Sequence, residues 1–353
     1  MAPGRAREPR GPVPARASGA DGGRPAEGGG RGPGVRAAGG GFPVKPEAVR
    51  VGVVGLGKWG RHHVRIYHQL PEAHLVAVVS PNPEEVAEFS ARYRVPGFPD
   101  HRELVGKVDA VSVVAPTVHH YAIARDLLQA GVHVLVEKPI TARVEEAREL
   151  VALARARNLV LLVGHVERFK PSVEELLQRA REPVFVQARR VRPYQPGRAT
   201  DVGVVMDLMI HDIDIVLSLT GSHVNRVTGI GARLYDGDED LAVAHLVLED
   251  GCVASLVASR VSPQKAAEIE VTTPDGSVYL NYLREHMVVR SATGRREFPV
   301  RHEEPLRAEL RHFLACVRGD ATPRVPGEAG LEALEVAQRI LDEMTVVTPR
   351  VRV

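Results

Sequence analysis

Short apolar runs alternate with amphipathic segments between residues 48 and 165. Strands are predicted where the runs are brief and rich in valine, at 51–54, 75–79, 110–114, 132–136 and 160–163. Helices are predicted between them, where apolar residues recur at helical spacing, including 83–93, 120–130 and 143–157. Strands and helices that alternate along the chain predict an α/β domain built on a parallel sheet.

The pattern changes after residue 165. A helix is predicted over 203–219, and strand-like runs follow it at 226–234, 241–248, 253–260, 268–273 and 277–282. This order predicts an α+β domain with an open, mostly antiparallel sheet, closed by helices at 305–318 and 330–344. One face of the sheet is expected to pack on helices. The other is expected to form a homo-oligomer interface, because the apolar face of a large open sheet needs covering.

The first 47 residues are predicted to be a disordered tail. Residues 1–41 contain 13 glycines and six prolines but hardly any large apolar side chains, so they cannot bury enough surface to fold. They also hold seven arginines against three acidic residues, whereas the remainder has 39 basic and 41 acidic residues. We interpret the tail as a nonessential extension or a wrongly assigned start. A nucleic-acid or membrane-surface arm is the alternative.

The rest of the composition is that of an ordinary globular protein. The sequence has no apolar run of about 18 residues and no secretory signal, so neither a membrane span nor secretion is expected. Its two cysteines, Cys252 and Cys316, are far apart and form no metal-binding pair. We expect a cytoplasmic protein with no metal site and no nucleic-acid partner.

The segment Gly55-Leu56-Gly57-Lys58-Trp59-Gly60 follows the first predicted strand and opens a helix. Glycines at this spacing permit a tight turn, close approach of the backbone to a pyrophosphate, and a helix N-terminus directed at negative charge. A second strand ends about 20 residues later, as in a dinucleotide-binding unit. A plain strand–turn–helix is the alternative.

Ligands of such sheets lie at the carboxyl ends of the strands, so the residues after each strand are further candidates. Ser80 follows the second strand, where NAD enzymes usually carry Asp or Glu, and no arginine at 80–84 could receive the 2′-phosphate of NADP. We expect NAD, with NADP not excluded. Pro116, Thr117 and His120 follow the next strand, although a threonine there serves equally well as a helix cap.

Glu137 and Lys138 end the following strand. Lysine is rarely buried unless it is paired or functional, and burial lowers its pKa and suits it to proton transfer. Glu137 could hold Lys138 or contact the cofactor. An ion pair at the edge of the sheet is an equal alternative.

Four polar residues share one face of the helix predicted over 203–219: Asp207, His211, Asp214 and Ser218. The other positions are apolar except Asp212, which indicates a buried helix whose polar stripe lines a cavity. Asp207 and His211 are spaced to pair, so that the carboxylate orients the imidazole and favours its charged form, as in a general acid/base. A satisfied buried polar network or half a metal site are the alternatives.

Together these motifs resemble the Gfo/Idh/MocA family of NAD(P)-dependent sugar oxidoreductases. The resemblance rests on the glycine turn, residues 115–120, Glu137-Lys138-Pro139, and the Asp-x-x-x-His of Asp207 and His211. It implies a Rossmann domain at 48–165 and a substrate and oligomerisation domain at 166–345, with an open sheet that forms dimers or tetramers. It also implies that Lys138, Asp207 and His211 are catalytic. Ser80 departs from the aspartate of many members, and residues 201–204 depart from their run of glycines.

Residues 164–171 and 198–214 resemble more closely the UDP-N-acetylglucosamine 3-dehydrogenases within that family. Those enzymes oxidise the sugar 3-hydroxyl before amination, for lipid A or other surface glycans. A nucleotide-sugar substrate is implied, since a diphosphate requires charged, planar donors. The candidate substrate ligands are Arg168, Tyr194, Arg198, Asp207 and His211.

Several alternatives remain at this point. Arg189, Arg190 and Arg192 could also meet the diphosphate or could form a solvated strand face. The substrate could be another sugar or a cyclitol, or the chain could be a redox-neutral NAD-dependent glycosidase. A non-catalytic NAD-binding regulator is disfavoured by the joint occurrence of the three catalytic residues. Whether Lys138 or His211 is the base is open.

Overall fold

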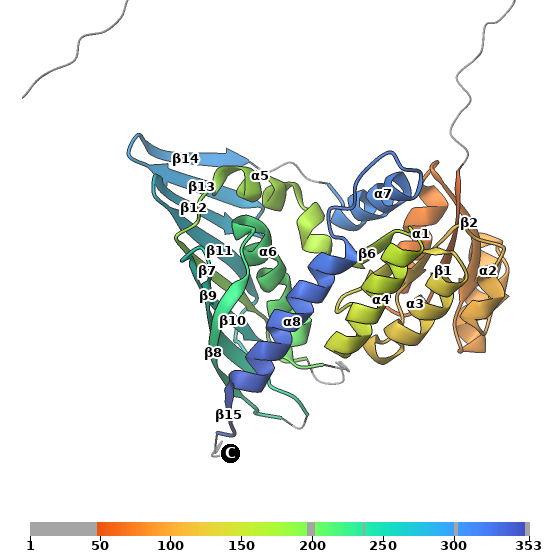
Figure 1. Ribbon diagram of the computed structural model, residues 1–353, viewed down its shortest axis with the longest axis horizontal. Coiled ribbons are helices and arrows are strands. Elements are labelled where there is room, and N and C mark those ends of the chain that lie inside the picture. The colour runs from red at the N-terminus through yellow and green to blue at the C-terminus, as the bar shows by residue number, and fades with distance from the viewer. Residues whose placement is uncertain (1–47, 196–201, 236, 300–302, 350–353) are drawn as a thin grey trace, which may run out of the picture. The chain divides into compact units, whose positions relative to one another are not determined.

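Valine-rich segments form a six-stranded parallel sheet in the order β3-β2-β1-β4-β5-β6. The computed structural model describes residues 48–195, 202–235, 237–299 and 303–349 (Figure 1). The strands of this sheet are β1 (Val49–Val54), β2 (Ala73–Val79), β3 (Gly97–Phe98), β4 (Ala110–Val113), β5 (His133–Glu137) and β6 (Leu161–Gly164). The predicted parallel sheet is confirmed, and this order places a ligand crevice between β1 and β4.

Helices cover both faces of the parallel sheet, because successive strand residues point to opposite sides. The intervening helices are α1 (Gly60–Gln69), α2 (Pro83–Tyr93), α3 (His120–Gln129) and α4 (Val144–Ala156). Side chains of α3 and α4 share a core with one face, and side chains of α1 and α2 share a core with the other. Helix α7 (Pro305–Val317) belongs to this second core, so a late segment of the chain packs on the first sheet.

The second sheet has nine strands in the order β14-β13-β12-β11-β7-β10-β9-β8-β15. Its strands are β7 (Phe185–Val191), β8 (Val224–Ala232), β9 (Leu241–Leu248), β10 (Val253–Ser259), β11 (Ala266–Thr273), β12 (Gly276–Asn281), β13 (His286–Ser291), β14 (Gly294–Pro299) and β15 (Thr345–Val347). Only the β7–β10 and β8–β15 pairs are parallel. The predicted open, mostly antiparallel sheet is confirmed, and β7 is an additional central strand that the pattern did not predict.

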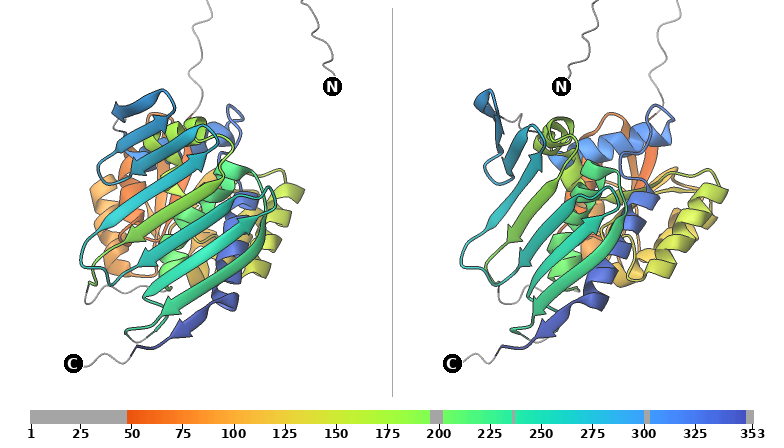
Figure 2. Two further views of the ribbon diagram at one scale, coloured as in Figure 1. Left: turned by 90° about the vertical axis from the view of Figure 1, so that its left-hand side faces the viewer. Right: turned by 60° about the vertical axis from the view of Figure 1, so that its left-hand side comes forward.

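One face of this sheet packs on α5 (Pro171–Arg179), α6 (Ile210–Thr220) and α8 (Gly327–Glu343). Figure 2 shows the opposite face turned to the viewer, with no helix in front of it. Apolar residues lie in register on that open face, where Ile230 pairs with Val243 and Phe185 pairs with Val253. Ile230 is 59% exposed, so the open face presents apolar surface to its surroundings.

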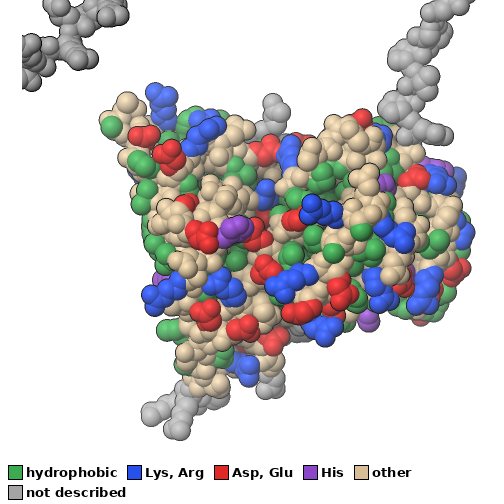
Figure 3. All heavy atoms as spheres, in the orientation of Figure 1, with side chains coloured by type: hydrophobic (Ala, Val, Ile, Leu, Met, Phe, Trp, Pro, Cys, Tyr) green, Lys and Arg blue, Asp and Glu red, His purple; other side chains and the backbone are tan. Residues whose placement is uncertain are grey.

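Charges of both signs are interspersed on the outer surface over α4 and α8 (Figure 3). Arg148 on α4 pairs with Glu335 on α8 at 2.7 Å, which links the two helices. Within the described ranges, no helix combines the length and apolar character needed to span a bilayer. The predicted tail, 1–47, lies outside the described residues.

Candidate active site

The turn between β1 and α1 has the backbone that a bound pyrophosphate requires. Gly55 has φ +95°, and a Cβ there would lie 2.6 Å from the backbone of Val114. A Cβ on Gly60 would lie 1.9 Å from the carbonyl oxygen of Gly55, so both positions need glycine. A Cβ on Gly57 would meet nothing within 4 Å. Open space therefore faces the N-terminus of α1, which has no side-chain cap to occupy its N–H groups.

A cavity of about 860 Å³ extends from this turn along the carboxyl edge of the parallel sheet. The predicted cofactor residues that line it are Gly55, Leu56, Gly57, Lys58, Trp59, Ser80, Pro116, Thr117, His120, Glu137 and Lys138. Gly60 begins α1 and is not among the residues that line the cavity. A cavity of this size, with the glycine turn at one end, fits a dinucleotide.

His120 links two loops at this edge. Its Nδ1 lies 2.9 Å from the carbonyl oxygen of Pro139, and its Nε2 lies 2.8 Å from the carbonyl oxygen of Ala115. The loop after β4 is thereby held to the loop after β5 at Pro139, the residue that follows Lys138.

Lys138 and Asp207 meet across the cavity. Lys138 Nζ donates to the main-chain carbonyl of Asp207 at 2.7 Å and to its carboxylate Oδ1 at 3.3 Å. Arg192 Nη2, at the end of β7, donates to Oδ2 of the same carboxylate at 3.4 Å. Asp207 also lines the cavity, so this carboxylate joins the parallel sheet to the second sheet at the ligand site.

His211 is only partly buried, but its Nδ1 is enclosed and has no hydrogen-bond partner among the described residues. Burial, together with the charges of Lys138 and Arg190, holds the pKa of His211 well below its ordinary value. The expectation that a carboxylate favours the charged imidazole is therefore wrong. Burial is the largest cause and the neighbouring cations add to it, so the structure favours neutral His211.

The predicted helix over 203–219 begins with a π-helical turn, η4 (Val205–Met209), and continues as α6. Val205 N–H, at the start of this turn, donates to Glu239 Oε1 at 2.8 Å. A π turn changes the angular relation of residues on either side of it, so the four-residue stripe does not run through. The part of the polar stripe that lies on α6 is retained, since Asp214 and Ser218 both contact Arg168.

The three remaining candidate substrate ligands are Arg168, Tyr194 and Arg198. Arg168 lies outside the cavity lining, and besides Asp214 and Ser218 it donates to the carbonyl of Arg324 at 3.1 Å. Tyr194 is 42% exposed and stacks on Tyr235 with ring centroids 4.0 Å apart. Arg198 lies outside the described residues.

Two of the further arginines are also engaged. Arg190 Nη2 donates to Asp212 at 2.8 Å, and its Nη1 donates to Glu167 at 3.3 Å. Arg189 lies 3.5 Å from Glu268 on the neighbouring strand. These contacts place both arginines in the structure of the second sheet, and Asp212, which lay outside the predicted stripe, is a buried ion-pair partner.

His165 was not singled out by the sequence pattern. It follows β6 directly, is fully buried, and neither ring nitrogen has a partner among the described residues. Its ring is perpendicular to that of His211, with centroids 6.2 Å apart. Burial lowers its pKa, helped by the charges of Lys138 and Arg168. Its position just after a predicted strand was the available signal, as it was for Lys138.

Two carboxyl groups, Glu137 and Glu309, interact electrostatically in this part of the molecule. Glu137 Oε1 lies 3.2 Å from His63 Nε2 on α1. Burial opposes ionisation of Glu137, but the hydrogen bond from His63 and the charges of His63 and Lys138 hold its pKa below the ordinary value. Glu309 on α7 is fully buried, and neither carboxyl oxygen has a partner among the described residues. Burial and the charge of Glu137 raise the pKa of Glu309 well above its ordinary value.

The residues that the structure describes contain no group of three or more His, Cys, Asp or Glu side chains placed to hold a metal ion.

Comparisons with known proteins agree with this geometry. Residues 49–165 match the family model described as an oxidoreductase family with an NAD-binding Rossmann fold, and residues 181–279 match the GFO/IDH/MocA C-terminal domain. UDP-N-acetylglucosamine 3-dehydrogenase of Acidithiobacillus ferrooxidans is 36% identical over 303 residues, which cover 83% of this chain and 96% of that protein.

The structural comparison points the same way. A solved structure of the Acidithiobacillus ferrooxidans enzyme aligns with a TM-score of 0.81 at 34% identity, over 85% of this chain and 98% of that one. The scyllo-inositol 2-dehydrogenase (NAD(+)) of Bacillus subtilis is 28% identical over 302 residues, covering 78% of this chain and 88% of that protein.

Proposed function

The chain belongs to the Gfo/Idh/MocA family of NAD-dependent oxidoreductases, and we propose that it oxidises the 3-hydroxyl of UDP-N-acetylglucosamine to a 3-keto sugar nucleotide. The contact of Lys138 with Asp207 at the edge of the cofactor cavity, within electrostatic reach of His211, carries the proposal. The sugar is suggested by the relative from Acidithiobacillus ferrooxidans, whose similarity extends over both domains.

NAD supplies the redox chemistry, since its nicotinamide accepts a hydride when the cofactor is bound. The residues of this chain that would hold it are the glycine turn, which receives the pyrophosphate at the N-terminus of α1, and the residues that line the cavity beyond it. Open space at Gly57 and the uncapped helix end support this placement.

Neutral His211 accepts the proton of the substrate hydroxyl. The O–H bond breaks, the carbon–oxygen double bond forms, and the C3–H electron pair leaves with its proton as hydride. Lys138 donates a hydrogen bond to the same oxygen and stabilises its developing negative charge. The neutral imidazole and the cationic ammonium group have separate roles, because His211 acts as the base and Lys138 as the electrostatic stabiliser.

Asp207 acts by positioning. Its carbonyl and carboxylate oxygens hold the Lys138 ammonium, and its second carboxylate oxygen faces Arg192. The lysine is thereby directed to one point at the cavity edge. Arg192 and the exposed Tyr194 follow one another closely at the end of β7, and with Arg198 they are our candidates for the nucleotide part of the substrate.

We also propose that the chain forms a homo-oligomer, a dimer or tetramer, through the open face of the second sheet. The register of Ile230 with Val243 and of Phe185 with Val253 supports this, because it puts apolar side chains in rows on an uncovered surface.

The test is an absorbance assay at 340 nm with UDP-N-acetylglucosamine, NAD⁺, a 3-aminotransferase and an amino donor, which draws the unfavourable ketone forward. Reduced cofactor together with a 3-amino product by mass spectrometry is the expected result. No reduced cofactor, with NAD⁺ binding demonstrated, would remove this substrate. A panel of cyclitols and sugars would follow, because an inositol dehydrogenase is among the relatives.

A further inference from the structure

The end of strand β2 lacks the carboxylate that usually contacts the adenosine ribose of NAD. Ser80 occupies that position and is buried. Its Oγ donates a 2.6 Å hydrogen bond to Oε2 of Glu85, which lies five residues later in the first turn of α2. Ser80 and Glu85 both line the cofactor cavity. A carboxylate is therefore present at this edge, supplied by the helix instead of the strand.

The turn between β2 and α2 holds Glu85 in this position. Asn82 N–H donates to Ser80 Oγ at 3.2 Å, so the hydroxyl accepts on one side and donates to Glu85 on the other. The side chain of Asn82 caps the helix by accepting from Glu84 N–H at 2.9 Å. The three bonds fix the first turn of α2 against the strand end.

We propose that Glu85 is the residue that selects NAD over NADP in this chain. Its carboxylate accepts the 2′-hydroxyl of the adenosine ribose, because a carboxylate has about four acceptor sites and the bond from Ser80 uses one of them. A 2′-phosphate at the same place would meet a negative charge and would lose the hydroxyl donor. This inference concerns the cofactor alone and does not depend on which sugar is oxidised.

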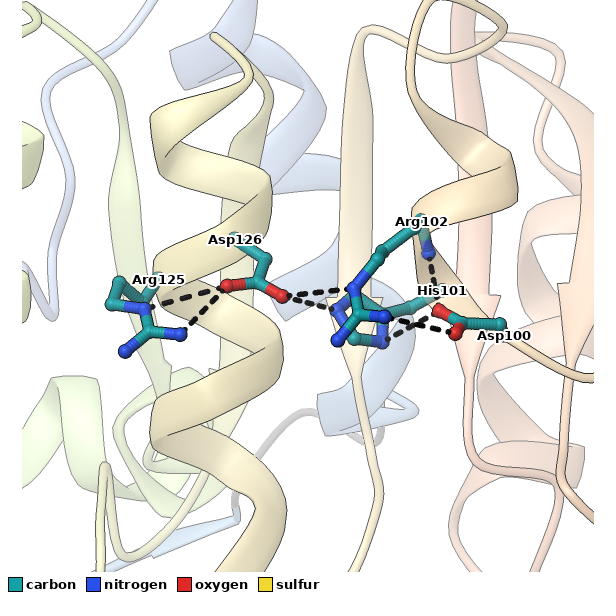
Figure 4. Close-up of polar contacts among 5 residues, drawn as sticks. All are labelled: Asp100, His101, Arg102, Arg125 and Asp126. Carbon is teal, nitrogen blue, oxygen red and sulfur yellow. Dashed lines mark hydrogen bonds and ion pairs between the residues drawn. The ribbon is translucent and has the colours of Figure 1, made fainter.

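The neighbouring charges favour the same choice. Asp100, from the loop after β3, lines the same cavity. Figure 4 shows that two arginines of this region, Arg102 and Arg125, have carboxylate partners: Arg102 lies 3.5 Å from Asp100 and 3.3 Å from Asp126, and Arg125 lies 3.0 Å from Asp126. These two guanidinium groups, of the kind that usually binds a 2′-phosphate, are thus engaged with carboxylates.

Two groups on the cavity wall oppose this preference. Lys58, in the glycine turn, is exposed and lines the cavity, and His101 lines it beside Asp100. An ammonium group binds phosphate as a point charge, so Lys58 is the residue of this site that would favour NADP. Binding experiments with NAD⁺ and NADP⁺ therefore measure the net result of the opposing charges of Glu85 and Lys58.

The experiment uses Trp59, the only tryptophan of the chain, which lines the cavity and is 48% exposed. The full chain is titrated with NAD⁺ and with NADP⁺, without any sugar, by tryptophan fluorescence and by calorimetry. We expect the wild type to bind NAD⁺ at least about tenfold more tightly than NADP⁺. Glu85→Gln should weaken NAD⁺ and strengthen NADP⁺, moving the ratio of the two dissociation constants by about 10- to 100-fold.

Glu84→Gln is the matched control, since Glu84 precedes Glu85 in the same helical turn but does not line the cavity. It should leave the ratio within about twofold of the wild type. Glu85→Ser provides a second variant that removes the carboxylate. A wild type that prefers NADP⁺, or an unchanged ratio in both Glu85 variants, would overturn the proposal. Because no sugar is present, neither result bears on the oxidation of UDP-N-acetylglucosamine.

Discussion

Lys138 Nζ lies 2.7 Å from the main-chain carbonyl oxygen of Asp207, which ties the end of strand β5 to the π-helical turn η4. Lys138 directly follows β5 and Asp207 lies in η4, and both residues line the cofactor cavity. The π turn presents a backbone carbonyl and a carboxylate to one ammonium group. Local helix geometry and the placement of the lysine are thus parts of the same arrangement.

Lys138→Met should lower kcat by about 10²- to 10⁴-fold, because it removes the donor that stabilises the developing alkoxide. The effect on KM for the sugar should be much smaller. Steady-state kinetics with the coupled assay measures both constants, and circular dichroism checks that the variant is folded. If kcat is unchanged and kcat/KM falls by this factor only because KM rises, Lys138 would be assigned to substrate binding.

The pH dependence of activity should reflect neutral His211. Because burial and nearby cations lower its pKa, the acid limb of the kcat/KM profile should lie below the ordinary histidine value of about 6.5. The rate should therefore hold through pH 6.5 and fall only as the pH drops through the lowered pKa of the folded state. His211→Asn should lower kcat by about 10²-fold or more and abolish this limb. Wild-type rates in that variant would reject His211 as the base.

The glycine turn allows a matched comparison. Gly57→Ala should fold normally, since its Cβ meets nothing within 4 Å, yet weaken NAD⁺ binding by about tenfold or more by filling the space for the pyrophosphate. Gly60→Ala should also lower the melting temperature, because its Cβ would lie 1.9 Å from a carbonyl oxygen. Thermal unfolding and NAD⁺ titration of both variants test this. Undiminished NAD⁺ affinity in Gly57→Ala would contradict the placement of the pyrophosphate.

Glu309 should make the fold less stable as the pH rises. Its pKa is raised well above the ordinary value, so above about pH 4.5 the unfolded chain releases a proton that the folded chain retains. The free energy of unfolding then decreases with rising pH until the pKa of the folded state is reached. Glu309→Gln removes this titration and should be more stable than the wild type at pH 8 by on the order of 1–3 kcal/mol. Denaturant unfolding at pH 5 and pH 8 measures the difference, which should shrink at the lower pH.

The open sheet should determine the oligomeric state. Sedimentation velocity of the wild type is expected to show a dimer or tetramer. A Phe185→Glu and Ile230→Lys double variant should shift it toward monomer, since both residues project from the uncovered face. A monomeric wild type, or an unchanged oligomer in the double variant, would place the interface elsewhere or remove it.

The strands of the parallel sheet were predictable because they are buried on both faces and consist largely of valine and leucine. Strand β3 was not, because it has two residues, and β7 was not, because Gln187 and Arg189 on its outer face interrupt the apolar run. The edge strand β14 is mostly polar, and its neighbour β13 is apolar only at Met287, Val288 and Val289. The apolar pattern alone therefore identifies strands that are buried on both faces. It misses strands that are very short or that have a polar outer face.

The candidate site was also predictable only in part. The position of Lys138 at a strand end indicated its importance, whereas its contact with Asp207 became visible only in the structure. The spacing of polar residues did not predict the π turn, whose first N–H is bonded by Glu239, a residue distant in sequence. The lowered pKa of His211 likewise arises from burial and from cations on other segments. Glu85 completes the ribose site only once α2 is folded against β2.

The most direct test follows the hydride itself. UDP-N-acetylglucosamine carrying deuterium at C3 is incubated with the full chain, NAD⁺ and the coupled 3-aminotransferase, and the reduced cofactor is analysed by mass spectrometry. Our account predicts that the deuterium appears in the nicotinamide ring and that a 3-amino sugar nucleotide accumulates. Reduced cofactor without deuterium, or no reduced cofactor at all from a protein that binds NAD⁺, would contradict it.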